Sequence, residues 1–413
     1  MVSANAETEW WPMSQRDLAN TGYSNSVGPK TNNVLWNFTA GGWVWSDVAV
    51  VDGLVYVGCY DQKVYALDAT TGNKVWEYAT EGRITSSPAV AEGIVYIGSD
   101  DYNVYALDAK TGDLKWKYTT GGEVQSPPKV ADGVVFVGSR DDNLYALDAK
   151  TGNIVWTFTT EDDVCATPAV AEGFVFVGSF DYKVYALDAT TGQQIWSFPT
   201  ESYVESTPTF ADGVVYFGSF DNKTYAVDAT TGQQIWSFET GHDLCVQSSP
   251  AVANGVLYVG SSYAGTLNGA VFALDASDGS LVWEYDTDGL VFCAPVVVGD
   301  VVYVGSGYMG PPPTEMSQEA FAVVFTGLRG NVYALDAIKG TLVWNYTTGG
   351  AVYSSPAVVD EVLYVGSMDS NVYAFGSPIQ SDSDIPITYL LAGVSVIIIV
   401  VVAVLLLKKR RSK

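Results

Sequence analysis

The chain has 413 residues, of which 20 are Lys or Arg and 46 are Asp or Glu, and its formal net charge is −26. Five of the 20 basic residues lie within 408–413, so the remainder carries 15 basic against 46 acidic side chains, a net charge of −31. Nucleic acid and anionic lipid surfaces repel such a domain. The charge therefore excludes nucleic-acid binding and favours a cationic partner, unless the acidity serves solubility alone.

Residues 1–32 precede the first repeat and form an N-terminal lead-in. Met1 to Ala6 has the Ala-x-Ala pattern of a signal-peptide cleavage site, but no basic or apolar region stands ahead of it. A truncated gene start explains this pattern, in which case the lead-in begins with the remnant of a cleavage region followed by a Trp-rich segment. The alternative is a tail-anchored protein whose main domain is cytoplasmic.

Residues 33–376 are built from one recurring motif. Its first full copy runs from Tyr65 through Ala-Leu-Asp-Ala-Thr-Thr to Gly72 and is followed by Trp76, and the next four copies come at intervals of 40 residues. Short segments of alternating apolar residues lie between Gly- and Asp-containing turns. A 40-residue repeat that is dense in short strands is typical of a β-propeller with one four-stranded blade per repeat.

The repeat count predicts an all-β, eight-bladed propeller. The first Trp of the motif has no third strand before it, and the last third strand, Val372 to Phe375, has no Trp after it. We therefore expect residues 33–39 to supply the outer strand of the blade that begins at Val352, which closes the ring and removes its open edge. We expect the eight motif tryptophans to pack as large apolar side chains between neighbouring blades. They are Trp36, Trp76, Trp116, Trp156, Trp196, Trp236, Trp283 and Trp344.

The motif resembles the tryptophan-docking repeat Ala-x-Asp-x-x-x-Gly-x-x-x-Trp of pyrroloquinoline-quinone-like (PQQ-like) propellers, and residues 66–76 match it fully. That family contains quinone-dependent dehydrogenases and non-enzymatic scaffolds such as BamB. Many of the dehydrogenases carry two adjacent cysteines against the cofactor, whereas the four cysteines here are scattered: Cys59, Cys165, Cys245 and Cys293. We therefore favour the BamB-like branch, with no catalytic residue, metal or cofactor. A surface dehydrogenase that uses PQQ with calcium is the alternative.

The start of each innermost strand follows the pattern x-Val-x-Ser-Ser-Pro, and its two variable positions are expected to face a central funnel. Blades seven, eight and one supply aromatic side chains there, and blades three to six supply carboxylates. A cationic or hydroxyl-rich partner fits such a funnel, that is, a protein, a peptide or a glycan. Alternatively, the aromatic residues only fill the channel. The candidate ligand-binding residues are Trp43, Trp45, Arg83, Glu123, Asp163, Glu205, Asp243, Phe292 and Tyr353.

Extra residues also gather on this face of the ring. They lie in the links between the second and third strands of blade six, 261–269, and blade seven, 306–330. The single histidine, His242, excludes a multi-histidine metal site. Cys245 and Cys293 are expected on inner strands of adjacent blades, and the sequence does not decide whether they form a disulfide.

The C-terminal residues predict a membrane anchor. Residues 377–386 form a polar stalk, 387–407 contain 21 residues without a charge, and 408–413 are basic. A helix of that length spans roughly 31 Å, which matches the bilayer core. The positive-inside rule then predicts a single-pass protein of the cell membrane, with the propeller outside and the basic tail in the cytoplasm.

Overall fold

The structure is a computed structural model that describes residues 10–240, 244–245, 248–263, 268–308 and 329–377. All regular structure in these ranges is β-strand. They contain no helix with the length and apolar character needed to cross a membrane. The predicted anchor, most of its stalk and its basic tail lie outside the described residues, as do residues 1–9. Residues up to Gly376 form one compact unit.

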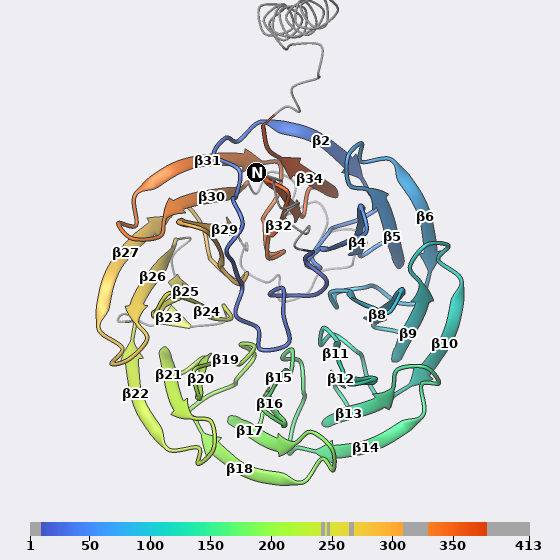
Figure 1. The fold of residues 1–413 in the computed structure, drawn as a ribbon, viewed down its shortest axis with the longest axis vertical. Helices are drawn as coiled ribbons and strands as arrows, with labels where there is room; N and C mark the ends of the chain where they lie inside the picture. The colour runs from blue at the N-terminus through green and yellow to red at the C-terminus, as the bar shows by residue number, and fades with distance from the viewer. Residues whose placement is uncertain (1–9, 241–243, 246–247, 264–267, 309–328, 378–413) are drawn as a thin grey trace, which may run out of the picture. The chain divides into compact units, whose positions relative to one another are not determined.

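Eight sheets are arranged as blades around a central axis, which confirms the predicted eight-bladed propeller (Figure 1). We number the blades by their innermost strands, which are β3 (Ala49–Val51), β7 (Ala89–Ala91), β11 (Lys129–Ala131), β15 (Ala169–Ala171), β19 (Thr209–Ala211), β24 (Ala251–Ala253), β28 (Val296–Val298) and β32 (Ala357–Val359). The second strands are β4 (Leu54–Gly58), β8 (Ile94–Gly98), β12 (Val134–Gly138), β16 (Phe174–Ser179), β20 (Val214–Gly218), β25 (Val256–Tyr263), β29 (Val301–Gly307) and β33 (Val362–Gly366).

The outer half of each blade follows the same order. The third strands are β5 (Lys63–Asp68), β9 (Asn103–Asp108), β13 (Asn143–Asp148), β17 (Lys183–Asp188), β21 (Lys223–Asp228), β26 (Gly269–Asp275), β30 (Gly330–Asp336) and β34 (Asn371–Phe375). The outer strands are β6 (Lys74–Ala79), β10 (Leu114–Thr119), β14 (Ile154–Thr159), β18 (Gln194–Pro199), β22 (Gln234–Glu239), β27 (Leu281–Thr287), β31 (Leu342–Thr348) and, for blade eight, β2 (Val34–Thr39). Two short strands, β1 (Tyr23–Ser24) and β23 (Leu244–Cys245), add to blades seven and six.

Burial explains why the strands differ in sequence. The middle strands are packed on both faces by neighbouring blades, so Val64 to Leu67 of β5 are all buried and read as a continuous apolar run. The outer strand β6 has one buried residue, Trp76, and its other side chains are exposed or half-buried. The core is therefore a series of layers between blades.

Each motif tryptophan docks on the next blade. Trp76 Nε1 donates to the carbonyl of Ala109 at 2.9 Å, and its ring packs on Gly112. Gly112 has φ +76°, and a Cβ there would lie 2.8 Å from the indole, so both the turn and the close approach require glycine. Six other tryptophans make the same bond: Trp36, Trp116, Trp156, Trp196, Trp236 and Trp283.

Blade eight closes the ring with strands from both ends of the propeller. Strand β2 pairs antiparallel with β34, with Trp36 opposite Ala374 and Thr39 opposite Asn371. The predicted closure is therefore confirmed. Because blade eight lacks the repeated turn after its third strand, Trp344 donates instead to the carbonyl of Pro29, at 3.0 Å.

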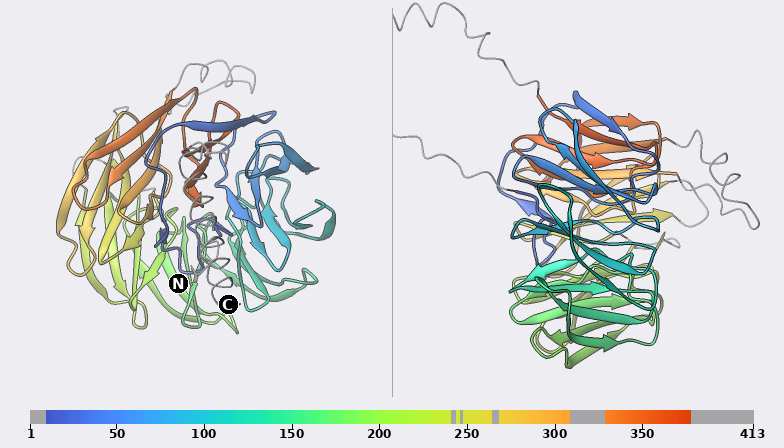
Figure 2. Two further views of the ribbon diagram at one scale, coloured as in Figure 1. Left: turned by 45° about the horizontal axis from the view of Figure 1, so that its top comes forward. Right: turned by 90° about the vertical axis from the view of Figure 1, so that its right-hand side faces the viewer.

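Residues 10–32 form a strap that crosses one face of the ring, which the sequence did not predict. In Figure 1 the strap runs across the face nearest the viewer, and in the right-hand view of Figure 2 it lies along one edge of the propeller. Its backbone carbonyls accept N–H groups of the innermost strands of blades one, two, four, five, six and seven, from Val50, Val90, Val170, Phe210, Val252 and Val297. The strap therefore ties most of the ring together through its centre.

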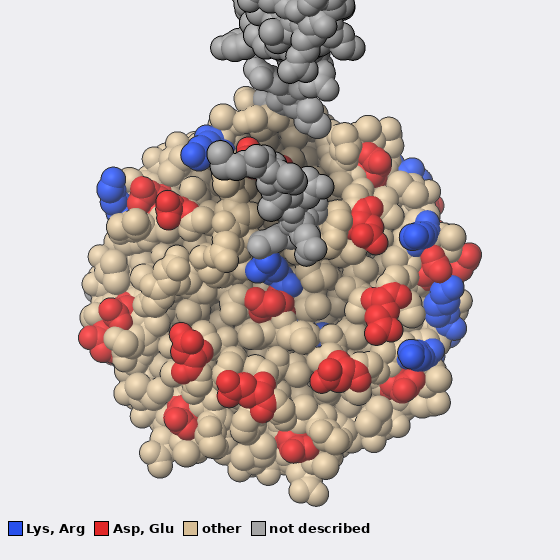
Figure 3. All heavy atoms as spheres, in the orientation of Figure 1, with Lys and Arg blue, Asp and Glu red and all other residues tan. Residues whose placement is uncertain are grey.

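The two faces of the ring differ. The strap face carries the turns between first and second strands and between third and fourth strands, and acidic side chains are spread around it in Figure 3. The opposite face, here the link face, carries the connections from one blade to the next and the links between second and third strands. In blades six and seven these links include 264–267 and 309–328, which lie outside the described residues.

Candidate functional site

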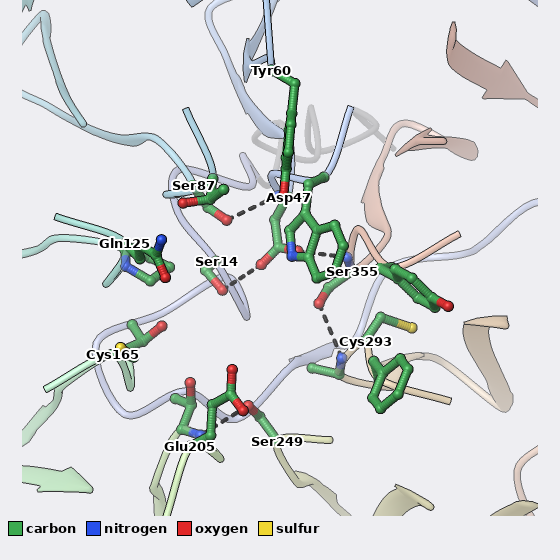
Figure 4. A pocket seen from close by; sticks show the side chains of 18 residues that line it. Ser14, Asp47, Tyr60, Ser87, Gln125, Cys165, Glu205, Ser249, Cys293 and Ser355 are labelled. Carbon is green, nitrogen blue, oxygen red and sulfur yellow. Dashed lines mark hydrogen bonds between the residues drawn. The ribbon is translucent and has the colours of Figure 1, made fainter. Parts of the chain in front are cut away.

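A cavity of about 260 Å³ lies on the axis of the ring (Figure 4). The starts of the innermost strands form its wall, and Ser14 of the strap lies at its floor. Because the strap closes the strap face, the cavity opens toward the link face. Among the residues that the structure describes, eighteen line it, and none of these is Lys or Arg.

Hydrogen bonds between neighbouring blades run around the cavity floor. They join residues that stand just before the proline position of the inner-strand motif. The N–H of Thr207 donates to the hydroxyl of Ser249 at 2.9 Å, and the N–H of Asp47 donates to the hydroxyl of Ser87 at 2.9 Å. In blade one this position is Asp47, whose Oδ1 accepts the N–H of Ser355 at 2.5 Å. Asp47 therefore joins blade one to blade eight, the blade that closes the ring.

The Asp47 carboxylate also holds the strap. Ser14 Oγ donates to Asp47 Oδ2 at 2.6 Å, as Figure 4 shows. Burial raises the pKa of Asp47 above its usual range, and the hydrogen bonds from Ser14, Ser355 and Ser87 oppose that rise. The carboxyl group faces the cavity but is already held by several donors.

Lys129 lies beneath the floor and is fully buried. Other blades have Ala, Thr or Val at this first position of the innermost strand. Its Nζ donates to the carbonyls of Ser14 and Asp17, both at 2.7 Å. Burial lowers its pKa to about 7, although the negative charges of Asp17 and Asp47 oppose that shift. Lys129 fixes the strap to blade three.

An aromatic wall forms one side of the cavity. The ring of Tyr353 lies 5.0 Å from that of Phe292 and 5.0 Å from that of Trp45, and Trp45 continues to Tyr60 at 6.2 Å. Trp43 packs on Tyr60 at 5.5 Å nearer the mouth. The aromatic side predicted from the sequence is therefore present, with Tyr60 as an additional member.

The structure separates the predicted site residues into two groups. Four line the cavity: Trp45, Glu205, Phe292 and Tyr353. Four are outside its lining: Trp43, Arg83, Glu123 and Asp163. Asp243 lies outside the described residues, as does His242.

The predicted acidic side is less acidic than the sequence suggested, because a basic residue pairs with two of its members. Arg140 lies 3.5 Å from Glu123 and 3.1 Å from Asp163. In blade six, Ser249 makes the bond expected of the motif, so by sequence count the first variable position of that blade is Cys245 and not Asp243. Arg83 pairs with Asp100 at 3.3 Å and lies over the ring of Tyr60, 5.4 Å from its centroid.

Among the lining residues that the sequence did not single out, three have a clear role in the geometry: Tyr60, Asp47 and Ser14. Tyr60 stands between Cys59 and Asp61 at the middle of a turn that reads Ser-x-Asp in most other blades. The middle residue varies, as Asp100 and Arg140 show, so its variability was a usable signal. Asp47 replaces the second Ser of a motif, which was also visible. Ser14 carried no signal, because nothing in the strap sequence shows that it reaches the axis.

Cys59, Cys165 and Cys293 are free thiols; Cys59 and Cys293 occupy positions that are serine in most other blades, and Cys165 occupies a variable position of the inner-strand motif. Cys293 Sγ accepts the N–H of Gly305 at 3.1 Å, just as Ser46 accepts that of Gly58 in blade one at 2.9 Å. Burial raises the pKa of Cys59, Cys165 and Cys293 to about 12. Because Cys293 is free, the disulfide with Cys245 that the sequence left open is not formed.

One acidic group lies away from the cavity lining. Within the described ranges, the carboxylates of Asp142, Asp162 and Asp163 form the one group of three potential metal ligands, with oxygens within 4.8 Å of one another. All three residues are in links on the link face, and Asp163 is already paired with Arg140. The group therefore does not contribute to the central site.

Comparisons with known proteins agree with this architecture. A family model described as outer membrane protein assembly factor BamB matches residues 21–86, 61–167, 154–310 and 309–377. No curated protein matches the chain. Among solved structures, BamB from Moraxella catarrhalis has a TM-score of 0.67 at 20% identity and covers 84% of this chain and 100% of its own.

Dehydrogenases have the same fold. A europium-containing methanol dehydrogenase has a TM-score of 0.73 at 16% identity and covers 89% of this chain and 98% of its own. The quinohemoprotein alcohol dehydrogenase of Comamonas testosteroni has a TM-score of 0.73 at 17% identity and covers 91% of this chain and 82% of its own. At these identities the likeness shows the fold alone, and fold does not decide between a scaffold and an enzyme.

Proposed function

The chain belongs to the repeat family described as outer membrane protein assembly factor BamB, and from that premise we propose that its propeller is a non-catalytic binding scaffold. The observation that supports this proposal is the central cavity. It is closed at one end by the strap and offers an aromatic wall with polar groups but no basic side chain. Such a cavity can bind a partner through the link face, which also carries the longest links.

The cavity does not fit the cofactor of the dehydrogenases. Pyrroloquinoline quinone is a planar polycarboxylate, whereas the described lining residues include two carboxylates, Asp47 and Glu205, and no cation to offset the cofactor's charge. Its 260 Å³ is also below the range of about 300–1,000 Å³ typical of drug-sized ligands. A quinone-dependent reaction therefore has no support at this site.

The described residues of the cavity lining do not provide a complete set of calcium ligands. Hard oxygen ligands usually number six to eight around this ion. In the part of the chain that the structure describes, the acidic group of Asp142, Asp162 and Asp163 stands apart from the lining, and no third carboxylate joins Asp47 and Glu205. The scaffold function is therefore favoured over the enzyme.

We also propose that the scaffold is held at the outside of the cell membrane. The uncharged run 387–407 has the length of a bilayer span, and the basic residues 408–413 behind it favour a cytoplasmic end. Its partner at the link face would then be an extracytoplasmic protein, peptide or glycan.

The absence of quinone catalysis can be tested directly. The full chain, purified in mild detergent, is incubated with pyrroloquinoline quinone and calcium, desalted, and assayed for quinone absorbance and for reduction of an artificial electron acceptor by alcohols. We expect neither signal. Quinone that co-migrates with the protein and supports acceptor reduction would contradict the scaffold proposal, and loss of that activity in Asp47→Asn would place the reaction in the cavity.

A further inference from the structure

The shape of the cavity limits which part of a partner can enter it. With the strap at the floor, a ligand enters and leaves through one mouth, so a polymer cannot pass through the ring. The volume of about 260 Å³ suits one ring-sized group better than a larger molecule. The cavity is therefore shaped for the end of a chain or for a small isolated group.

The lining favours an uncharged ligand with many hydroxyl groups. The lining residues that the structure describes include two carboxylates and no basic side chain, which disfavours an anion. Of the two carboxylates that could offset a cation, that of Asp47 is already held by Ser14 and the N–H of Ser355, so Glu205 is the one carboxylate left to distinguish a cationic from a neutral ligand. Most other polar groups in the lining are neutral and able both to donate and to accept, as hydroxyls of a ligand also are: Gln125, Thr85, Thr167, Thr207, Ser249 and Tyr60.

The aromatic wall complements the apolar side of such a ligand. A sugar ring presents C–H groups on its faces, and Trp45, Phe292 and Tyr353 offer adjoining ring surfaces for them. Trp45 and Phe292 are half-buried, so part of each ring remains accessible. A compact ligand can therefore contact rings on one side and hydrogen-bonding groups on the other.

A second aromatic surface lies on the link face beside the cavity. Phe180, Tyr182, Tyr203 and Phe220 form this rim patch, with Tyr203 5.0 Å from Phe180, 5.1 Å from Tyr182 and 6.1 Å from Phe220. Tyr182 is 43% exposed and Tyr203 39% exposed. Tyr203 lies two residues before Glu205 of the cavity lining, so blade five leads from the cavity to the rim patch. Exposed aromatic groups of this kind mark binding surfaces.

Resting on the proposed scaffold function, we propose that the cavity holds the terminal residue of an uncharged oligosaccharide whose next residues lie on the rim patch. The closed floor selects the chain end, the neutral polar lining binds its hydroxyls, and the aromatic wall packs on its ring. Basic peptides, which the acidic charge of the domain also allows, are the competing ligand class.

The experiment uses the full chain in detergent on an array of linear neutral oligosaccharides built from glucose, mannose, galactose and N-acetylglucosamine. The strongest binder is then titrated by calorimetry, and the methyl glycoside of its terminal residue is added as a competitor. We expect binding, competition by the single residue, and weakening by about tenfold in Trp45→Ala and in Tyr203→Ala. Tyr203 is exposed, so its removal leaves the fold intact even if Trp45→Ala does not.

A matched pair supplies the control. Tyr182 and Tyr102 occupy the same turn position in blades four and two, with φ +69° and +71° and exposed fractions of 43% and 47%. Tyr182→Ala should weaken binding, whereas Tyr102→Ala should not. Equal effects of the two, or binding that survives both Trp45→Ala and Tyr203→Ala, would overturn the proposal.

Other outcomes separate this inference from the proposed function. If no neutral saccharide binds, and acetyl-lysine amide or a basic peptide binds in a Trp45-dependent way, the saccharide inference is wrong and the scaffold function stands. If nothing in either class binds, the inference is also wrong. Quinone-dependent acceptor reduction would remove the scaffold function itself.

Discussion

Lys129 shows how one buried residue can make stability depend on pH. Its amino group has no contact with solvent, and its two hydrogen-bond partners are backbone carbonyls of the strap. The fold therefore stabilises the neutral amine relative to the ammonium ion, which is why the pKa falls from 10.5 to about 7.

We expect the free energy of unfolding to rise between pH 7 and pH 9. In that window the unfolded chain keeps a proton on Lys129 that the folded protein has released, so stability increases with pH, by at most about 1.4 kcal/mol per pH unit. Denaturant unfolding of the wild type and of Lys129→Met measures this slope, which the variant should lose. Lys110→Met, at an exposed lysine, is the control. An unchanged slope in Lys129→Met would contradict the assignment.

Two glycines with the same backbone conformation test the docking of Trp76. Gly93 and Gly112 both have φ +76°, but a Cβ at Gly93 meets no atom within 4 Å, whereas one at Gly112 meets the indole of Trp76. Gly93→Ala should cost about 1–2 kcal/mol through backbone strain. Gly112→Ala should cost roughly 1–3 kcal/mol more through overpacking, as measured by denaturant unfolding. Equal losses would mean that the contact with Trp76 contributes little.

At this scale the sequence was informative wherever residues repeat. The docking tryptophans and turn glycines could be predicted because eight copies of one environment select the same side chains. The site was harder to predict because its residues occur once each. Trp45, Phe292 and Tyr353 stood at variable positions of a known motif, whereas the pairing of Arg140 with Glu123 and Asp163 depends on the direction of side chains at the rim.

At the scale of elements, the strap and β2 have separate roles although they are consecutive in the chain. The strap closes the centre of the ring, and β2 covers the edge of β34. The closing strand was predictable because the blade count left one strand missing at each end. The strap was not predictable. Its backbone–backbone hydrogen bonds join residues up to 275 positions apart, as between Val297 and Gly22, and backbone atoms carry no sequence signal.

Two shortened chains should distinguish these roles. A chain that begins at Gly41 lacks β2 and exposes the edge of β34, so we expect it to aggregate. A chain that begins at Gly28 keeps β2 and the Pro29 carbonyl that Trp344 uses, so we expect a monomer of lower stability. Light scattering and thermal unfolding measure both outcomes. A monomeric Gly41 chain with unchanged stability would show that β2 is not needed for closure.

At the scale of the whole molecule, the acidic propeller and the basic C-terminus predict opposite sides of a membrane. Protease added to intact cells should remove the propeller and leave a small membrane-bound fragment that contains 387–413. An antibody against the C-terminus detects this fragment, and cells opened with detergent give the control digestion. Complete protection of the propeller in intact cells would contradict the outward orientation and favour a tail-anchored protein.

The pairing of β2 with β34, here the seam of blade eight, also sets the order in which the ring can be closed during synthesis. Asn37 of β2 and Asn371 of β34 are 334 residues apart, so the ribosome makes one edge of the seam long before the other. At about 5–20 residues per second, the interval is roughly 17–67 s. During that time β2 has no partner, while the intermediate blades can already form. Until its last strand emerges, the nascent chain therefore presents the unpaired edge of β2, which can mispair with a strand of another copy.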